Sequence, residues 1–405
     1  MILTEKHIID NNHQFFLECD SLCFKSKNIY NQGLYNVRQF YFENKKYLNY
    51  VENYHVSKKQ ESYSQLPTKV SCQTLKLVDQ NFKSFFGLLK TEGCIARIPR
   101  YLKKDGRYLI KFPKQSLSLK EFKKTGKLKL SQTNIIINTK ITDYNNLKEV
   151  RIVPRTDHYI IEIVYEKKEK ASSKSDVIAS IDVGLNNLAT ICFNKKDIKP
   201  FIINGRVLKS INQYYNKTKS KITSKLEREN NVKTSKRLKT LTNKRNYKID
   251  DYMHKASRLL VNQLVLNNTG VLIIGKNVGQ KQDTNMGKIN NQNFVGVPIF
   301  KFLNMVAYKA RLEGINVIWQ EESYTSKASF LNLDFIPIYK HKSDIKCHFS
   351  GYRYKRGLYK IRGKKIFINA DVNGSYNILR KAVPNTFADG IEGFGVIPML
   401  MNIST

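Results

Sequence analysis

An acid inside an apolar run is the feature that most constrains this chain. Residues 177–184 are mostly apolar with several β-branched side chains, which predicts a buried sheet strand, yet Asp182 lies within the run. Burying a charge without a partner costs several kcal/mol, and a bound cation would offset that cost. The alternative is a strand-end aspartate followed by a turn at Gly184.

Two further acids occupy settings that suit the same cation. Asp371 follows an apolar stretch and opens an apparent helix, where an aspartate most often serves as the cap. Glu322 comes shortly after a predicted strand, next to Glu321. Because side chains alternate across a strand, only one of the two glutamates should face a shared site. The pairing of Asp371 with Asp182 favours such a site over two unrelated structural aspartates.

The charge balance indicates the partner. The 405 residues include 70 Lys and Arg against 33 Asp and Glu, a net charge of +37 with an isoelectric point near 9.8. Such a surface repels itself and persists most readily where a polyanion neutralises it. A hydrophobic content of 41% is normal for a globular chain. We therefore expect a folded protein that binds nucleic acid.

The sequence predicts no membrane association and a reducing compartment. It contains no apolar stretch long enough to span a bilayer and no signal-peptide core near Met1. Its six cysteines form neither a C-x-x-C pair nor a disulfide framework. Cys19 and Cys23 would share a helical face, where buried thiols are more common than a metal half-site. We expect a soluble cytoplasmic protein, associated with the nucleoid in a prokaryotic host.

Residues 1–170 predict a helical part followed by a β-rich part. Apolar and aromatic residues recur at helical spacing within about 13–91, with a break near Pro67. From about 94 to 166, short apolar runs alternate with turn signals, which predicts a barrel-like β module. The polar residues that follow, up to 175, predict a linker.

Residues 176–385 predict a mixed sheet flanked by helices. Three early strands precede a long helical hairpin at 208–267, and strand and helix then alternate, with one helix beginning at Pro298. Residues 328–365 are expected to form an insert, and residues 386–405 a C-terminal tail.

Two basic regions predict nucleic-acid contacts. The hairpin carries many basic and few acidic residues; a solvated helix face is the usual explanation, but the one-sided balance favours phosphate contacts. Residues 352–360 interleave aromatic and basic side chains, which suits binding of single strands and equally a plain β-hairpin. The candidate nucleic-acid-binding residues are Lys236, Arg237, Lys276, Asn277, Arg353 and Arg356.

Three stretches resemble the TnpB (OrfB) proteins of insertion sequences, whose RuvC-type nuclease domain is shared with type V CRISPR effectors and Fanzor proteins. These are residues 181–190 (IDVGLNNLAT), 324–327 (YTSK) and 369–374 (NADVNG). The resemblance implies an α+β multidomain fold. A helical, REC-like part and a β-barrel, WED-like part at 1–170 would precede an RNase H-like (RuvC) mixed α/β domain at 176–385.

One departure from the family concerns the second catalytic acid. Many members carry it directly after the fourth strand, but this chain has Gly275 there, which cannot bind a metal. Some members resemble a rearranged version with a substitute glutamate three residues before a Thr-Ser pair. Glu322 holds that position ahead of Thr325 and Ser326. We therefore assign the role to Glu322, with Glu321 as the fallback.

The other departure concerns zinc. Relatives often carry a cysteine pair after the Thr-Ser pair and a second one before the last aspartate. This chain has Ser329 and Asn332 at the first place and only Cys347 and His348 near the second. Two soft ligands do not complete a tetrahedral zinc site, so no zinc is expected and the insert should fold by packing alone.

The resemblance implies an RNA-guided DNA endonuclease encoded by an insertion sequence, of a kind often labelled transposase. Its partners would be a guide RNA and target DNA. Asp182, Glu322 and Asp371 would hold two magnesium ions for phosphodiester hydrolysis. The alternatives are a nuclease-inactive RNA-guided DNA-binding repressor, which Gly275 invites, and a guide-free basic nuclease. Monomer and dimer both stay open.

Overall fold

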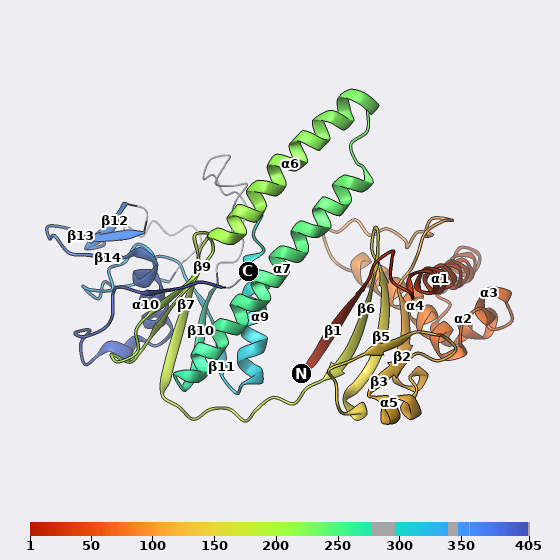
Figure 1. The fold of residues 1–405 in the computed structure, drawn as a ribbon, viewed down its shortest axis with the longest axis horizontal. Coiled ribbons are helices and arrows are strands. Elements are labelled where there is room, and N and C mark those ends of the chain that lie inside the picture. The colour runs from red at the N-terminus through yellow and green to blue at the C-terminus, as the bar shows by residue number, and fades with distance from the viewer. Residues whose placement is uncertain (277–295, 339–346, 356, 404–405) are drawn as a thin grey trace. The chain divides into compact units, whose positions relative to one another are not determined.

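The computed structural model describes residues 1–276, 296–338, 347–355 and 357–403. Two of the candidate nucleic-acid-binding residues, Asn277 and Arg356, lie outside the described residues. The chain divides into two compact units, Met1–Lys168 and Glu169–Thr405 (Figure 1). No helix in the described ranges combines the length and the apolar character needed to cross a membrane.

The helices predicted in the first unit form, and Pro67 directly precedes the last of them. They are α1 (Phe16–Asn44), α2 (Tyr50–Ser57), α3 (Glu61–Ser64) and α4 (Thr68–Leu89). Helices α1 and α4 approach closely at Gly33, where a Cβ atom would lie 2.5 Å from Cδ2 of Leu75. A cluster of buried side chains that includes Leu34 and Phe82 joins the same two helices.

The β-rich part of the first unit is an open sheet, so the predicted barrel is wrong. Its strands are antiparallel in the order β1 (Ile2–Ile9), β6 (Tyr159–Glu166), β5 (Leu147–Pro154) and β2 (Ile110–Pro113). The edge strands β1 and β2 do not pair with each other. Strand β2 has four residues, and helix α4 packs beside it, so the sheet buries one face on helices instead of closing on itself.

Smaller elements complete the first unit. A separate two-stranded ladder joins β3 (Lys127–Lys129) and β4 (Ile136–Asn138), preceded by helix α5 (Leu119–Thr125). Two 3-10 turns span Lys114–Ser116 and Tyr144–Asn146. Residues 97–102 lie within the predicted β-rich part but form no regular element, whereas β1 forms where no strand was expected.

The second unit is built on a six-stranded mixed sheet in the order β11-β10-β7-β8-β9-β15. Its strands are β7 (Val177–Val183), β8 (Asn187–Phe193), β9 (Phe201–Asn204), β10 (Thr269–Lys276), β11 (Asn316–Glu321) and β15 (Met399–Met401). The first three form an antiparallel meander, and β10 and β11 run parallel to β7. The carboxyl ends of these three parallel strands therefore meet at one edge.

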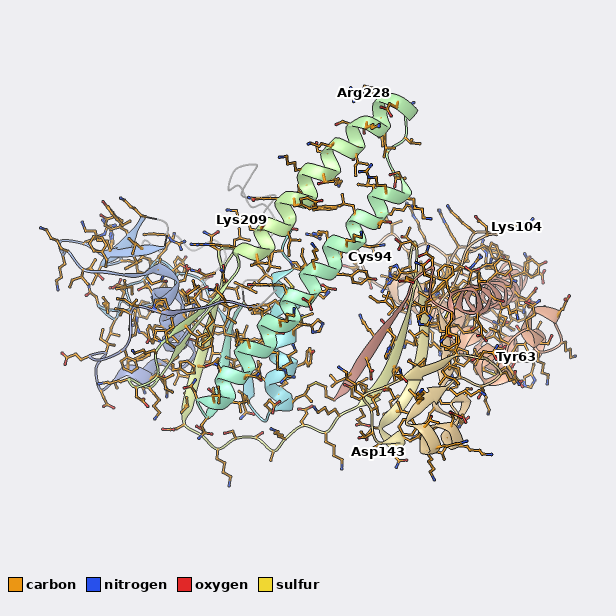
Figure 2. All side chains as sticks on the ribbon, in the orientation of Figure 1. Tyr63, Cys94, Lys104, Asp143, Lys209 and Arg228 are labelled. Carbon is orange, nitrogen blue, oxygen red and sulfur yellow. The ribbon has the colours of Figure 1, made fainter. Side chains whose placement is uncertain are left out.

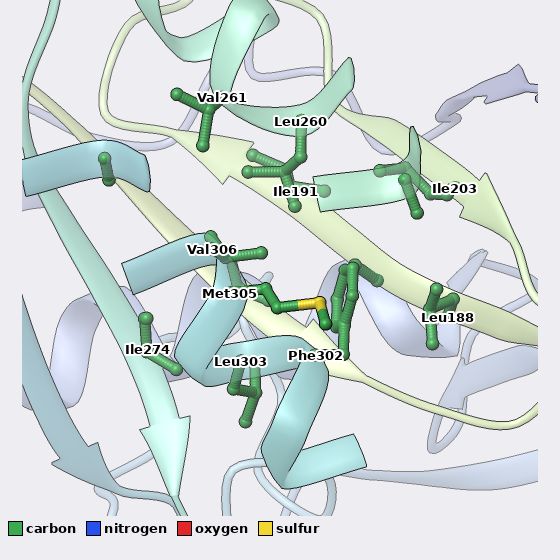
Figure 3. Close-up of a cluster of buried hydrophobic side chains, with 14 of the residues drawn as sticks. Leu188, Ile191, Ile203, Leu260, Val261, Ile274, Phe302, Leu303, Met305 and Val306 are labelled. Atoms are coloured by element: carbon green, nitrogen blue, oxygen red, sulfur yellow. The ribbon is translucent and has the colours of Figure 1, made fainter. Parts of the chain in front are cut away.

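Successive side chains of each strand point to opposite faces of the sheet, and different helices pack on each face. Those of the second unit are α6 (Arg206–Asn230), α7 (Lys236–Leu266), α9 (Ile299–Leu312) and α10 (Ala370–Ala382). Ile274 of β10 packs with Leu260 of α7 and Phe302 of α9 (Figure 3). Its neighbour Ile273 points to the opposite face and packs with Tyr376 of α10. The mixed sheet flanked by helices is as predicted.

The insert between β11 and α10 contains a three-stranded antiparallel sheet. Its strands are β12 (Gly351–Lys355), β13 (Leu358–Ile361) and β14 (Phe367–Asn369), and β14 leads directly into α10. Asp334 fastens the described part of the insert by accepting hydrogen bonds from the Ser329 N–H at 2.8 Å and the Ser350 hydroxyl at 2.7 Å. A 3-10 helix, Pro384–Phe387, follows α10.

Replacing Phe302 by Ala should destabilise the second unit. Phe302 is fully buried between α9 and the sheet, so truncation should lower the free energy of unfolding by about 3–5 kcal/mol. The matched control is Phe300→Ala on the same helix, which is 56% exposed and should cost about 1 kcal/mol or less. Trp319, the only tryptophan, lies on β11 and reports this unit by fluorescence during denaturant unfolding. Equal costs for both variants would contradict the packing described here.

Candidate active site

The face of the sheet that packs on α10 carries the polar residues of β7. Ile181 points into the core beneath α7 and α9, so its neighbours Ser180 and Asp182 point the other way. The Ser180 hydroxyl donates a hydrogen bond to the Ser375 carbonyl of α10 at 2.7 Å, which fixes this orientation. Asp182 follows on the same face, at the end of the strand where α10 begins.

Helix α10 brings the second acid to the same place. The side chain of Asn369 caps this helix by accepting hydrogen bonds from the Asp371 N–H at 2.9 Å and the Val372 N–H at 3.1 Å. Asp371 is therefore not the cap, and its carboxylate is available for another role. One turn along, a Cβ at Gly374 would lie 2.6 Å from Oδ2 of Asp182, so helix and strand are in direct contact.

The third acid, Glu322, directly follows the end of strand β11. Gly275 pairs with Gln320 in the parallel ladder of β10 and β11, and Glu322 lies two residues beyond. A Cβ at Gly275 would lie 2.5 Å from Oε2 of Glu322 and 2.8 Å from Cδ1 of Ile378 on α10. The glutamate thus occupies the space that a side chain at Gly275 would fill. Among the described residues, the buried Oε2 of Glu322 has no hydrogen-bond partner.

The adjacent residues Glu321 and Glu322 lie in environments that shift their pKa values in opposite directions. Glu321 accepts hydrogen bonds from the Lys381 ammonium and the Ser323 N–H, both at 2.5 Å. Burial would raise the pKa of Glu321, but these hydrogen bonds outweigh it and the pKa is lowered. Burial raises the pKa of Glu322 to about 6, and the charge of Glu321 adds to the shift. Glu322, not Glu321, is the carboxylate without a neutralising partner.

The charges of the other two acids act on Asp182. Desolvation raises the pKa of Asp182 well above its usual value, and the negative charges of Asp371 and Glu322 raise it further. The nearby guanidinium of Arg353 acts in the opposite direction. Arg353 compensates the negative charge around Asp182 only in part, and a bound cation would relieve the remainder.

Asp371 has polar partners of its own. Its Oδ1 accepts a hydrogen bond from Arg353 of β12 at 3.0 Å, and its Oδ2 accepts one from Asn187 of β8 at 2.6 Å. In the described ranges, no three acidic, thiol or imidazole side chains are grouped tightly enough to hold one metal ion as they stand. The electrostatic coupling at Asp182 is compatible with this, because charges act over longer distances than a metal–ligand bond.

Two asparagines of α10 hold the segment that follows Glu322. Asn373 accepts a hydrogen bond from the Phe330 N–H at 2.9 Å and donates one to the Ala328 carbonyl at 2.8 Å. Asn377 donates to the Thr325 carbonyl at 2.9 Å. Both side chains are fully buried, so they tie the Thr-Ser segment to the helix that carries Asp371.

The other predicted residues lie at different places in the second unit. Arg353 is at the site, whereas Lys276 at the end of β10 lies over the rings of Phe300 and Trp319 at 5.8 Å. Lys236 and Arg237 begin α7. Two residues at the site were not predicted from sequence. Asn187 belongs to the 181–190 stretch, which could have pointed to it, but no sequence signal marks Lys381.

Family models and known proteins of several kinds are similar to this chain. The OrfB_IS605 family model, described as a probable transposase, matches residues 162–281, and the model of the Cas12f1-like TNB domain matches residues 300–378. A TnpB-like protein of Methanocaldococcus jannaschii is 26% identical over 269 residues, which cover 61% of this chain and 87% of that protein.

Two further similar proteins are CRISPR proteins. The CRISPR-associated endodeoxyribonuclease Cas12f2 of a Micrarchaeota archaeon is 25% identical over 248 residues, which cover 56% of this chain and 41% of that protein. The chain thus spans less than half the length of Cas12f2. A solved Cas12f1–sgRNA–target DNA complex has a TM-score of 0.52 at 15% identity, covering 89% of this chain and 81% of the other. At this identity the likeness concerns the fold alone.

Replacing the two neighbouring glutamates should change stability in opposite directions. The folded-state pKa of Glu322, about 6, exceeds its usual 4.5, so its contribution is fully present below about pH 4.5 and lost as the pH rises through 6. In EDTA at pH 8, Glu322→Gln should therefore be about 1 kcal/mol more stable than wild type, with no gain at pH 4.5. Glu321→Gln should be about 1–3 kcal/mol less stable at pH 8, because it removes the negative charge that pairs with the nearly buried Lys381 ammonium.

Urea unfolding followed by Trp319 fluorescence at both pH values measures these differences. If Glu321→Gln stabilised the protein and Glu322→Gln destabilised it, the assignment of the free carboxylate to Glu322 would be wrong.

Adding one methyl group at Gly275 should disturb the site. Gly275→Ala forces the new Cβ against Glu322 and Ile378, and such overpacking should lower the free energy of unfolding by about 1–3 kcal/mol. Part of that loss should disappear in a Glu322→Ala background, where the contacted oxygen is absent. The control Gly87→Ala, with open space around the new Cβ, should be neutral or slightly stabilising by calorimetry. A Gly275→Ala protein as stable as wild type would refute the close approach.

Proposed function

Because the chain is a member of the TnpB (OrfB) family, related to type V CRISPR effectors, we propose that it is an RNA-guided DNA endonuclease. The observation that carries this proposal is the Glu322 carboxylate. Among the described residues, its buried Oε2 has no hydrogen-bond partner, and this oxygen fills the space above Gly275 on the sheet edge that also holds Asp182. A repressor that had lost catalysis would have no need to retain such a group.

The donor set suits magnesium. Asp182, Glu322 and Asp371 offer only carboxylate oxygens, which Mg²⁺ prefers, and no cysteine or histidine belongs to the set. Two such ions, when bound, supply an activated water and positive charge for the departing 3′ oxygen of a phosphodiester. The raised pKa of Asp182 and the unpartnered oxygen of Glu322 are the features of this chain that fit such a cation.

The remaining side chains of the site hold or neutralise charge. The guanidinium of Arg353, 57% exposed beside Asp371, can bind a phosphate oxygen of the strand to be cut. Lys381, with a side chain only 5% exposed, binds Glu321 and the Ser323 carbonyl. It thereby holds the residues on both sides of Glu322, and we assign it a positioning role.

Guide RNA and target DNA are the proposed partners. The solved Cas12f1 relative is a complex with an sgRNA and target DNA, and the net charge of +37 suits binding to polyanions. Sequence would then be selected by base pairing with the guide, while the protein contacts backbone and shape. The proposal includes an origin in an insertion sequence, in keeping with the probable-transposase description of the matching family.

Cleavage of plasmid DNA in Mg²⁺ by the protein with its co-purified RNA tests this function. Asp182→Ala, Glu322→Ala and Asp371→Ala should each lower the cleavage rate by about 10³-fold or more while leaving nucleic-acid binding nearly intact. Asp176→Ala, an acid 80% exposed just before β7, is the matched control and should cut normally.

Three results would lead to other conclusions. No cleavage by the wild type would indicate an RNA-guided binding protein, and cleavage after removal of the RNA would indicate a guide-free nuclease. Cleavage by Glu322→Ala but not by Glu321→Ala would move the metal ligand by one residue.

A further inference from the structure

The hairpin of α6 and α7 extends well beyond the sheet (Figure 1). Between Asn212 and Ile249 the only buried residue is Leu238, among the side chains that the structure describes. Side chains therefore project outward along α6 from Lys209 to Arg228 (Figure 2). This part of the hairpin has almost no hydrophobic core of its own, and packing alone does not explain its length.

The charge of the hairpin is equally one-sided. Residues 206–249 include fourteen Lys or Arg and two Asp or Glu. Both acids, Glu227 and Glu229, lie near the tip, and Glu229 pairs with Lys225. Like charges at this density repel each other, so an anion that binds along the hairpin is stabilised and stabilises the hairpin in return.

A groove of about 850 Å³ lies between the two helices. Basic side chains of α7, including Lys236, Lys244 and Lys248, line one wall, and no acid is among the lining residues. In the described ranges, none of these three lysines has an acidic partner within ion-pair distance. The α6 wall carries Tyr214, a residue that is 68% exposed.

The floor of the groove is fixed in place. The Tyr215 hydroxyl hydrogen-bonds the Thr242 hydroxyl across the helices at 3.1 Å. The Arg245 guanidinium lies 5.5 Å from the centre of the Tyr215 ring and donates a hydrogen bond to Oδ1 of Asn212 at 2.8 Å. These contacts hold the helices at a set spacing and leave Tyr214 and the lysines facing the opening.

We propose that this groove binds a single-stranded segment of nucleic acid, with one base stacked on Tyr214 and phosphates against Lys244 and Lys248. Packed helices lie about 8–10 Å apart, so a groove between them admits one backbone but not a duplex. An exposed aromatic ring flanked by unpaired cations is the arrangement that binds single strands without reading sequence. The segment can come from RNA or from DNA, because both present the same phosphates and stacked bases.

This surface goes beyond the cleavage site, since none of its residues is among the three acids or their partners. It can therefore be tested in EDTA, where no cleavage occurs. A failure of the nuclease proposal would leave the result unaffected, and a failure here would leave the cleavage assay unaffected.

Fluorescence anisotropy with labelled 12-nucleotide RNA and DNA strands of the same sequence, added to the full RNA-stripped protein, measures the affinity. Tyr214→Ala should weaken binding about 5- to 150-fold, the range for loss of one stacked base. Lys244→Ala should weaken it and lower the slope of log affinity against log salt by about 0.7. The RNA and DNA arms show which strand the groove prefers.

Two control variants match these changes in residue type and exposure. Tyr35→Ala removes a ring that is 51% exposed on α1, and Lys225→Ala removes a lysine of α6 that does not line the groove. Both should bind within about twofold of wild type. Strands carrying 5-iodouracil should cross-link, on irradiation, to the peptide that contains Tyr214. Equal losses in Tyr214→Ala and Tyr35→Ala, or cross-links only elsewhere, would overturn the proposal.

Discussion

The close approach of helix α10 to the end of the central sheet is the constraint on which the second unit depends. Strand alternation gives β7 and β10 one apolar face beneath α7 and α9, and one face on which Ser180, Asp182 and Gly275 lie. Two glycines permit the contact, because a side chain at Gly275 or Gly374 would meet a carboxylate oxygen within 3 Å. The contact between α10 and the sheet therefore determines both the packing of the second unit and the positions of the acids.

Much of the fold could be predicted because its signals are local. Periodicity and prolines located the helices of the first unit, the long hairpin and the helix after Pro298, and apolar runs located five of the six strands of the mixed sheet. The sixth strand, β15, lies in the residues predicted as a C-terminal tail. Such local signals could not predict whether the strands of the first unit close into a barrel. Short alternating strands have the same local pattern in an open sheet, and closure depends on partners far apart in sequence. Strand β1, for example, pairs with β6 between Ile2 and Glu166.

The candidate site was predictable in its residue types but not in its contacts. Alternation required that one of two adjacent glutamates face the site. Lys381, sixty residues along the chain from Glu321, determines which one, since it binds Glu321. The sequence also allowed Asp371 to be the cap of its helix, and this is excluded only because Asn369 is the cap in the structure. Such contacts join residues that are distant in sequence, and no spacing rule encodes them.

The sheet edge and the α6–α7 hairpin carry charge of opposite sign. At the sheet edge, acids crowd together and raise the pKa of Asp182, so a phosphate strand is repelled there unless cations and Arg353 compensate. Along the α6–α7 hairpin the balance is reversed, and a strand is attracted without any compensation. Under the proposed function, the residues that bind the strand and the residues that carry the cleavage chemistry are then different. A chain built in this way can keep a polyanion bound while the acids themselves contribute nothing to its affinity.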